Sequence, residues 1–137
     1  MNKKAFTLIE LLIVVALIGI LSSIGVITFQ GQIKASKQKK AEINLNSINL
    51  ALQEYKSNKG SYYYDANSCS STSNKKINDD LFDGVKNLAE KSEDMVFQYC
   101  ITKRNEDGFT IKATNPDTNC EITLKDDLDL WRDPSNC

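Results

Sequence analysis

The sequence predicts an α+β fold, in which one long N-terminal helix carries a head built on a three-stranded antiparallel sheet. Residues 11–33 contain no charged side chain. This run passes without a proline into a polar segment whose apolar residues recur every three or four positions. Further along, three short segments alternate apolar with polar residues, and the four cysteines lie in the same polar part of the chain. Together these observations predict a helix packed on a sheet and held by disulfides.

The first element is an apolar helix over residues 6–33. As a helix rising about 1.5 Å per residue, the 23 residues from Leu11 to Ile33 cover roughly 34 Å. That length is enough to cross the roughly 30 Å hydrocarbon core of a bilayer. We therefore expect residues 6–33 to be a transmembrane segment that protrudes from the head.

The helix continues as an amphipathic half over residues 34–58. One stripe has intervals of four, three, four and three residues: Ala41, Leu45, Ile48, Leu52 and Tyr55. Asn58 and Gly60 are residue types that end helices, because both tolerate positive φ. This stripe is expected to pack on the sheet of the head, which takes up residues 59–137.

The head is predicted to begin with a polar connection over residues 60–76 and a short helix capped by Asn78. Three strands follow, over residues 95–103, 109–114 and 121–125. Their inward-facing side chains are Met95, Phe97, Tyr99 and Ile101, then Phe109, Ile111 and Ala113, then Ile122 and Leu124. The tail after residue 125 has no strand pattern.

The four cysteines are Cys69, Cys100, Cys120 and Cys137, and none is in zinc-type spacing. An even number beyond an apolar segment predicts two disulfides in an oxidising, extracytoplasmic compartment. Four cysteines allow three connectivities. A meander separates its first strand from its third, which disfavours Cys100–Cys120. The preferred pairs are Cys69–Cys100 and Cys120–Cys137, although the sequence does not fix the connectivity.

Composition excludes several classes of function. The formal net charge is −1, histidine is absent, and neither a nucleophile motif nor a glycine-rich phosphate loop occurs. We therefore predict no catalytic residues, no cofactor and no metal. Asp126, Asp127 and Asp129 are interpreted as solvated acids rather than calcium ligands, because their spacing is not that of an EF-hand. Nucleic acid binding through Tyr62–Tyr64 is conceivable but not indicated.

Glu10 distinguishes the possible roles of the N-terminus. A secretory signal and a plain membrane anchor both fit the basic start and the apolar run, but neither needs an acid there. An intramembrane carboxylate costs roughly 2.5–3.5 kcal/mol on insertion scales, which makes it a functional hypothesis. Lysines also follow the apolar run, and they outnumber the two that precede it: Lys34, Lys37, Lys39 and Lys40. This opposes the positive-inside rule for a cytoplasmic N-terminus, whereas the cysteines place the head outside.

The run KKAFTLIELLIVVALIGIL resembles the class III leader and N-terminal helix of type IV prepilins. The resemblance implies a leader over residues 1–5, a cut between Ala5 and Phe6, and methylation of the new Phe6 amine. Glu10 is then the fifth mature residue, and it is expected to serve assembly together with Thr7. A charge pair between Glu10 and the Phe6 amine of a neighbouring copy would set the register of subunits. The family usually has glycine before the cut, where this chain has Ala5.

The resemblance further implies a non-enzymatic pilus subunit that adheres, twitches or takes up DNA. The chain would be single-pass in a bacterial inner membrane with its head outside, and extracellular after assembly. Its partners would be its own copies in a helical filament, other pilins, the prepilin peptidase and the inner-membrane assembly platform. The alternatives are a minor pilin and a type II secretion or competence pseudopilin, and more remotely a membrane-anchored binding domain. Major pseudopilins usually have a calcium loop and no disulfides.

Overall fold

The computed structural model describes residues 6–65, 67–90 and 96–137, with the backbone alone for residues 25–28. Ala5 and Met95, on which two sequence-based predictions depend, lie outside these ranges. The chain divides into two compact units, Met1–Ser36 and Lys37–Cys137. Helix α1, Leu8–Lys59, begins in the first unit and ends in the second.

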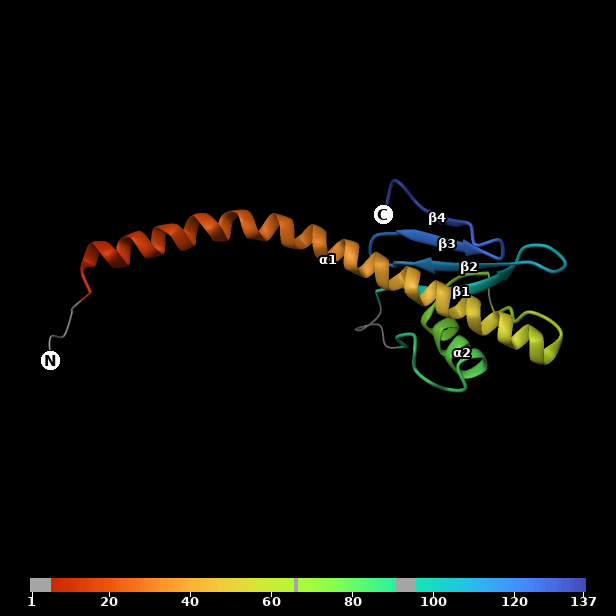
Figure 1. Ribbon diagram of the computed structural model, residues 1–137. Helices are drawn as coiled ribbons and strands as arrows, with labels where there is room; N and C mark the ends of the chain where they lie inside the picture. The colour runs from red at the N-terminus through yellow and green to blue at the C-terminus, as the bar shows by residue number, and fades with distance from the viewer. Residues whose placement is uncertain (1–5, 66, 91–95) are drawn as a thin grey trace. The chain divides into compact units, whose positions relative to one another are not determined.

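The second unit is an α+β head with a four-stranded antiparallel sheet (Figure 1). The strands are β1 (Gln98–Lys103), β2 (Phe109–Thr114), β3 (Glu121–Lys125) and β4 (Leu130–Arg132), in that order across the sheet. Ile111 of β2 lies opposite Ile101 of β1 and Leu124 of β3. The register thus places inward residues of three strands side by side, as expected from their alternation.

The core lies between this sheet and the part of α1 after Lys37. The predicted helical stripe is buried except for half-buried Tyr55, and the fully buried members are at most 1 % exposed: Ala41, Leu45, Ile48 and Leu52. They pack against the inward side chains of β1, β2 and β3. The helix ends at Lys59, one residue past the predicted bound, because Gly60 has φ of +81° and its N–H donates to the Lys56 carbonyl at 2.7 Å.

Two predictions about the head were wrong. The first is the three-strand count, since Leu130–Arg132 forms a fourth strand in which Trp131 pairs with Thr123. All three residues of β4 are exposed, so the strand has no buried face to produce an alternating pattern. The sequence signal for a strand is therefore missing, although its hydrogen bonds form.

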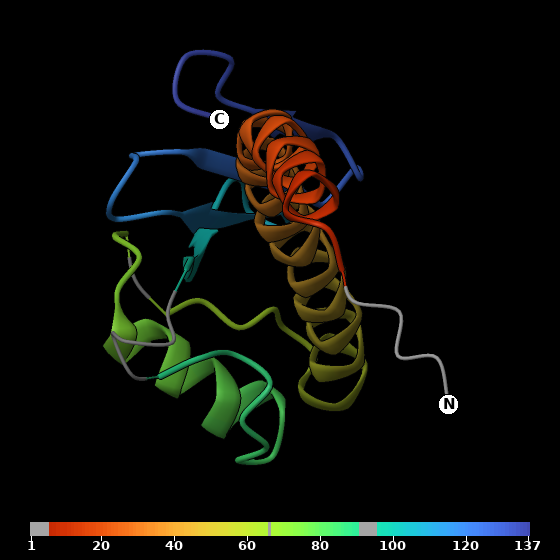
Figure 2. The same ribbon diagram turned by 90° about the vertical axis from the view of Figure 1, so that its left-hand side faces the viewer.

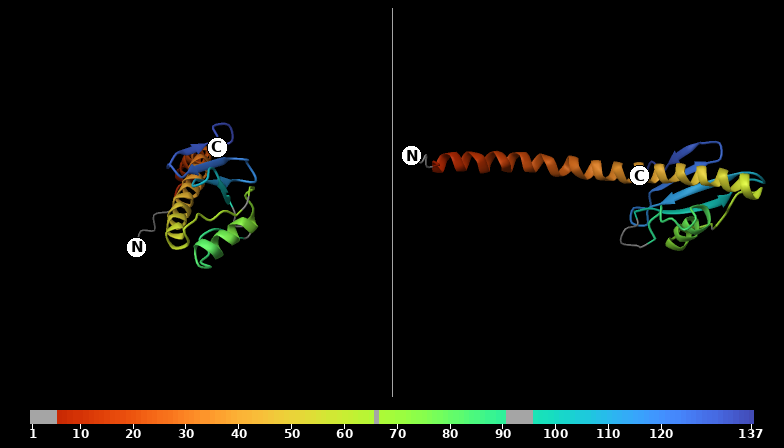
Figure 3. Two further views of the ribbon diagram at one scale, coloured as in Figure 1. Left: turned by 90° about the vertical axis from the view of Figure 1, so that its right-hand side faces the viewer. Right: turned by 60° about the horizontal axis from the view of Figure 1, so that its bottom comes forward.

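The second error concerns the second helix. Helix α2 is Ser71–Leu81, capped by the Ser70 side chain, which accepts from the Ser73 N–H at 3.2 Å. It therefore occupies residues 71–76 of the predicted connection and ends at Leu81, three residues after the Asn78 that was expected to cap the helix. Its buried face is Ser73, Asn74, Ile77 and Asn78, so mainly polar side chains face the core and conceal the helical period. Figures 2 and 3 show α2 at the β1 edge of the sheet.

Candidate functional site

The first unit presents an apolar surface with no cover. Its large exposed side chains, among the described residues, are Phe6, Leu8, Ile9, Leu11, Leu12, Ile13, Val14, Val15, Leu17, Ile18, Ile20, Leu21, Ile24, Phe29 and Ile33. Within the described part of the chain, α1 is the one helix long and apolar enough to cross a membrane. A signal sequence would pass the same test of length and composition. The residues at the start of the helix therefore have to distinguish a signal sequence from a retained membrane segment.

Thr7 and Glu10 form a reciprocal cap at the start of α1. The Glu10 Oε2 atom accepts hydrogen bonds from the Thr7 N–H at 2.9 Å and from the Thr7 hydroxyl at 2.7 Å. The Glu10 N–H in turn donates to Thr7 Oγ1 at 3.3 Å. This is the capping box, in which a threonine and a glutamate three residues later satisfy backbone N–H groups that have no partner within the helix. The Thr-x-x-Glu spacing was visible in the sequence, but its capping role was not recognised there.

The cap leaves half of the carboxylate unused. Both bonds from Thr7 go to Oε2, and Oε1 of Glu10 has no hydrogen bond to a described residue. Phe6, directly before the cap, is 79 % exposed. The structure therefore brings Phe6, Thr7 and Glu10 together at one end of an uncovered apolar helix. One acceptor atom of Glu10 remains available to a group from another molecule.

The lysines after the apolar run are all exposed. Lys39 forms an ion pair with Glu42, with 3.1 Å between Nζ and Oε2. Arg132 of β4 pairs with the other oxygen of Glu42, a residue only 4 % exposed. Glu42 therefore links α1 to the edge strand that sequence analysis missed. The ammonium groups of Lys34, Lys37 and Lys40 are not paired with any carboxylate in the described ranges.

Both disulfides of the head are present in the pairing that the sequence favoured. Cys69 bonds Cys100, joining the segment before α2 to β1, and Cys120 bonds Cys137, joining the tail to the start of β3. Gln38 of α1 also donates to the Cys137 carbonyl at 2.7 Å. The tail is thus attached to both the sheet and the helix.

Two buried asparagines of α2 hold the head in a way that sequence analysis missed. Asn74 accepts from the Tyr99 N–H at 2.7 Å and donates to the Ala89 carbonyl at 2.8 Å. Asn78 accepts from the Leu88 N–H at 3.0 Å and donates to the Leu88 carbonyl at 2.9 Å. Both side chains are 0 % exposed, so these bonds satisfy backbone groups that water does not reach. The only sign of this role in the sequence was the presence of two asparagines four residues apart in a polar segment.

The acids of the tail are paired with basic side chains. Arg104 bonds Asp126 at 3.0 Å and Asp127 at 3.1 Å, while Lys125 bonds Asp129 at 2.5 Å. Hydrogen bonds from Arg104 lower the pKa of Asp127 below its usual value. No group of three or more potential metal ligands occurs among the described residues. These three carboxylates are therefore paired with basic side chains and are not simply solvated acids.

The tyrosine run packs on the core. Tyr62 meets the Phe109 ring edge-on at 4.8 Å between centroids, and Tyr63 meets Tyr55 at 5.8 Å. The Tyr64 hydroxyl donates to the Gly108 carbonyl at 3.3 Å. All three tyrosines are half-buried, so their rings are used inside the head rather than presented for base stacking.

Comparison with known proteins places the resemblance at the N-terminus. Residues 1–26 match the family model of the prokaryotic N-terminal methylation motif. The Type IV major pilin protein PilA of Myxococcus xanthus (strain DK1622) is 44% identical over 61 residues. The alignment covers 44% of this chain, and the chain spans 28% of the length of that relative. No solved structure matches the chain. The expected resemblance to type IV prepilins is confirmed over the N-terminal motif.

Proposed function

Because this chain carries the prokaryotic N-terminal methylation motif and resembles a type IV major pilin, we propose that it is a structural subunit of a type IV pilus. The observation that carries this proposal is the capped start of α1 together with its uncovered apolar part, residues 8–36. Fully burying one large apolar side chain is worth roughly 1.5–3 kcal/mol, and residues 6–33 expose a long series of them. Such a segment is unstable in water and needs either lipid or other helices around it.

Type IV pilus assembly provides both environments in turn. Before assembly, residues 6–33 hold the subunit in the inner membrane with the head outside. During assembly, the same surface is buried against the helices of other copies in a helical filament. The prepilin peptidase and the inner-membrane assembly platform are the partners that this route requires, along with other pilins. In this role the chain is not an enzyme, and its head serves adhesion, twitching motility or DNA uptake.

Processing gives Glu10 its second role. Removal of residues 1–5 after Ala5 creates a positively charged amine on Phe6, which is then methylated. Glu10 keeps Oε2 on Thr7 of its own chain and offers Oε1 to the Phe6 amine of a neighbour. In a low-dielectric bundle such a pair is favourable when formed and costly when either charge is left alone. The pair therefore favours one register between subunits.

The paired acids and the disulfides support a pilus more than a secretion pseudopilin. Each acid that was considered as a calcium ligand has a basic partner, and two disulfides join distant parts of the head. A minor pilin would have the same features. A major subunit is therefore distinguished from a minor one by its abundance in the fibre.

Mass spectrometry of the N-terminal peptide tests the proposal. The peptide is compared between native membranes and material sheared from the cell surface. We expect a chain that begins at methylated Phe6 in both fractions, and its abundance in the sheared fraction separates a major from a minor subunit. A chain that begins at Met1, or one cut after Ser23, contradicts the proposal. The first result would indicate a plain anchored protein, and the second an ordinary secreted domain.

A further inference from the structure

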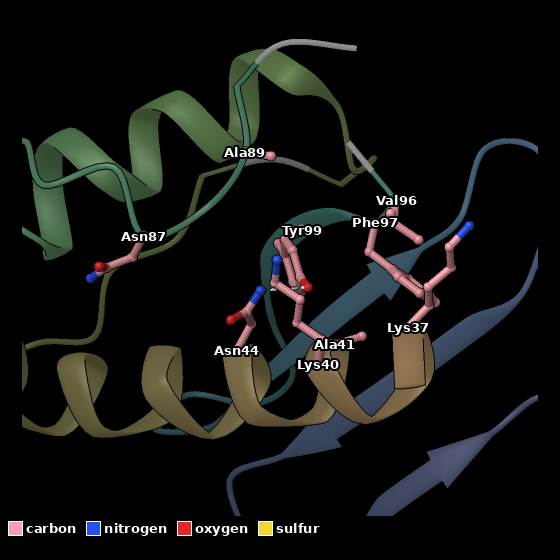
Figure 4. Close-up of a pocket in the computed structure, with 9 residues that line it drawn as sticks. All are labelled: Lys37, Lys40, Ala41, Asn44, Asn87, Ala89, Val96, Phe97 and Tyr99. Carbon is pink, nitrogen blue, oxygen red and sulfur yellow. Dashed lines mark hydrogen bonds between the residues drawn. The ribbon is translucent and has the colours of Figure 1, made fainter. Parts of the chain in front are cut away.

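The head has a pocket beside the first turns of its part of α1, which begins at Lys37. Its volume is about 70 Å³, several times the roughly 15 Å³ that one water molecule needs. Lys37, Lys40 and Asn44 line it from α1, and Phe97 and Tyr99 line it from the segment opposite. Figure 4 shows the Lys40 amine next to Tyr99, while the Lys37 side chain extends beside Phe97 and Val96 with its amine directed away from Tyr99. The pocket thus combines two flexible cations with a fixed aromatic floor.

The polar groups of the pocket include several hydrogen-bond donors. Asn44 donates through Nδ2 to the Tyr99 hydroxyl at 2.9 Å, which leaves the hydroxyl proton without an acceptor among the described residues. Burial raises the pKa of Tyr99 to about 12, so the hydroxyl keeps this proton at physiological pH. None of the described residues that line the pocket has a carboxylate. Two ammonium groups that have no carboxylate partner among the described residues, together with a phenol proton, suit a small anion.

The sequence places these lysines next to the apolar segment. Lys37 follows Ile33 by four residues, which is about 6 Å along a helix. If residues 11–33 span the hydrocarbon core, Lys37 falls at the depth of the lipid headgroups. Lys40 lies about one turn further out, and its long side chain leans back toward the N-terminus of the helix and so toward the same layer. Juxtamembrane lysines are attracted to anionic lipid, each contributing roughly a factor of five in affinity. A phosphate attached to acyl chains is the anion concentrated at that depth.

We propose that this pocket binds the phosphate of an anionic phospholipid while the subunit is held in the membrane. Lys37 and Lys40 supply the charge, and the Tyr99 hydroxyl supplies a fixed donor. The inference rests on the membrane-held stage of the proposed function and adds a ligand to it. Assembly into a filament then requires that the lipid be released from the pocket.

Native mass spectrometry of the full chain in a non-ionic detergent tests the lipid site. The chain is titrated with phosphatidylglycerol and, separately, with phosphatidylcholine, which binds the apolar helix without a net charge. We expect at least tenfold tighter binding of phosphatidylglycerol. The double variant K37Q/K40Q is expected to weaken that binding about 30-fold, while phosphatidylcholine binding stays unchanged.

The matched control is K75Q/K76Q, which removes the same charge from two exposed positions on α2. We expect it to change phosphatidylglycerol binding less than twofold. Equal binding of the two lipids, or equal loss in both double variants, overturns the proposal. Displacement of the lipid by millimolar inorganic phosphate would indicate a free-phosphate site and overturn it as well. The same spectra report the N-terminal mass, so a failure of prepilin processing is seen separately from a failure of lipid binding.

Discussion

Substitutions at Thr7 and Glu10 separate the two roles of one carboxylate. Glu10→Gln keeps an acceptor for the Thr7 N–H and hydroxyl but removes the charge, because glutamine also serves at the third position of a capping box. Thr7→Ala does the reverse, since it removes the hydroxyl that Glu10 bonds at 2.7 Å and leaves the charge in place. Glu10→Ala removes both the cap and the charge. Thr7→Ser keeps the hydroxyl and is the matched control.

The two roles differ in magnitude. Loss of a helix cap costs roughly 0.5–2 kcal/mol and typically about 1 kcal/mol, or about fivefold in an equilibrium. Removal of one partner from a buried ion pair costs roughly 3–5 kcal/mol, because the remaining Phe6 amine is left without a counter-charge. That corresponds to roughly two to almost four decades in the subunit concentration at which fibres form. We therefore expect Glu10→Gln to assemble about as poorly as Glu10→Ala, and Thr7→Ala to lose only a few-fold.

The assay is the ratio of sheared surface fibre to membrane-held subunit, measured by immunoblot, with the N-terminal mass of each variant as a check on processing. Only variants that begin at methylated Phe6 are compared, so that a peptidase defect is not taken for an assembly defect. Near-normal fibre yield from Glu10→Gln, with a loss from Thr7→Ala, would refute the charge pair. Glu10 would then act as a helix cap alone.

Three further predictions concern the head. Replacing Cys120 and Cys137 by serine opens a loop with a sequence separation of 17 and should lower the free energy of unfolding by about 3 kcal/mol in non-reducing urea titrations. Asn74→Leu should cost about 2–3 kcal/mol in the same titration, because backbone groups lose buried partners, while Asp79→Ala on the exposed side of α2 changes stability by less than about 0.5 kcal/mol. Above pH 10 the unfolded chain loses the Tyr99 proton, and the folded chain keeps it to about pH 12, so this one group should lower the free energy of unfolding by roughly 1.4 kcal/mol per pH unit in that interval. Tyr99→Phe should reduce this fall in alkaline unfolding titrations, and an unchanged slope would contradict the raised pKa.

The parts of the fold that could be predicted are those whose core contacts are apolar. Leu45, Ile48 and Leu52 on the helix, and Ile111 on β2, are all 0 % exposed, and their positions follow from periods of 3.6 and 2. Burial of apolar side chains repeats along the sequence with the period of the backbone. The long helix and three strands therefore needed no tertiary information.

The parts that could not be predicted are stabilised by polar contacts. Asn74 and Asn78 face the core on α2, where a polar residue normally indicates solvent, so the helix was interpreted as a connection. β4 has no buried residue and is defined by its pairing with β3 and by the ion pair of Arg132 with Glu42. Such contacts join residues far apart in sequence and leave no local pattern. The same reason explains why the lysine pocket was not foreseen.

The candidate site at the N-terminus could be predicted from the sequence only in part. Phe6 and Glu10 were singled out because an acid in an apolar run is costly, and this needs only composition. The capping geometry is local, so Thr7 with Glu10 could have been interpreted as a capping box from spacing alone. The choice of Oε2 for the cap, which leaves Oε1 without a hydrogen bond to a described residue, is a three-dimensional detail that no spacing rule gives.

The lysine pocket also bears on the orientation of the chain. Four lysines after the apolar run, against two before it, would draw the head toward the cytoplasm under the positive-inside rule. The two disulfides of the head favour an oxidising compartment, which is the opposite orientation and the one that the proposed function requires. An anionic phospholipid bound at Lys37 and Lys40 neutralises charge on the outer side, where the membrane potential disfavours cations. Because K37Q/K40Q removes the lipid site together with two of these four lysines, it should form the head disulfides outside the cytoplasm at least as well as the unchanged chain, and a loss of these disulfides would contradict this account.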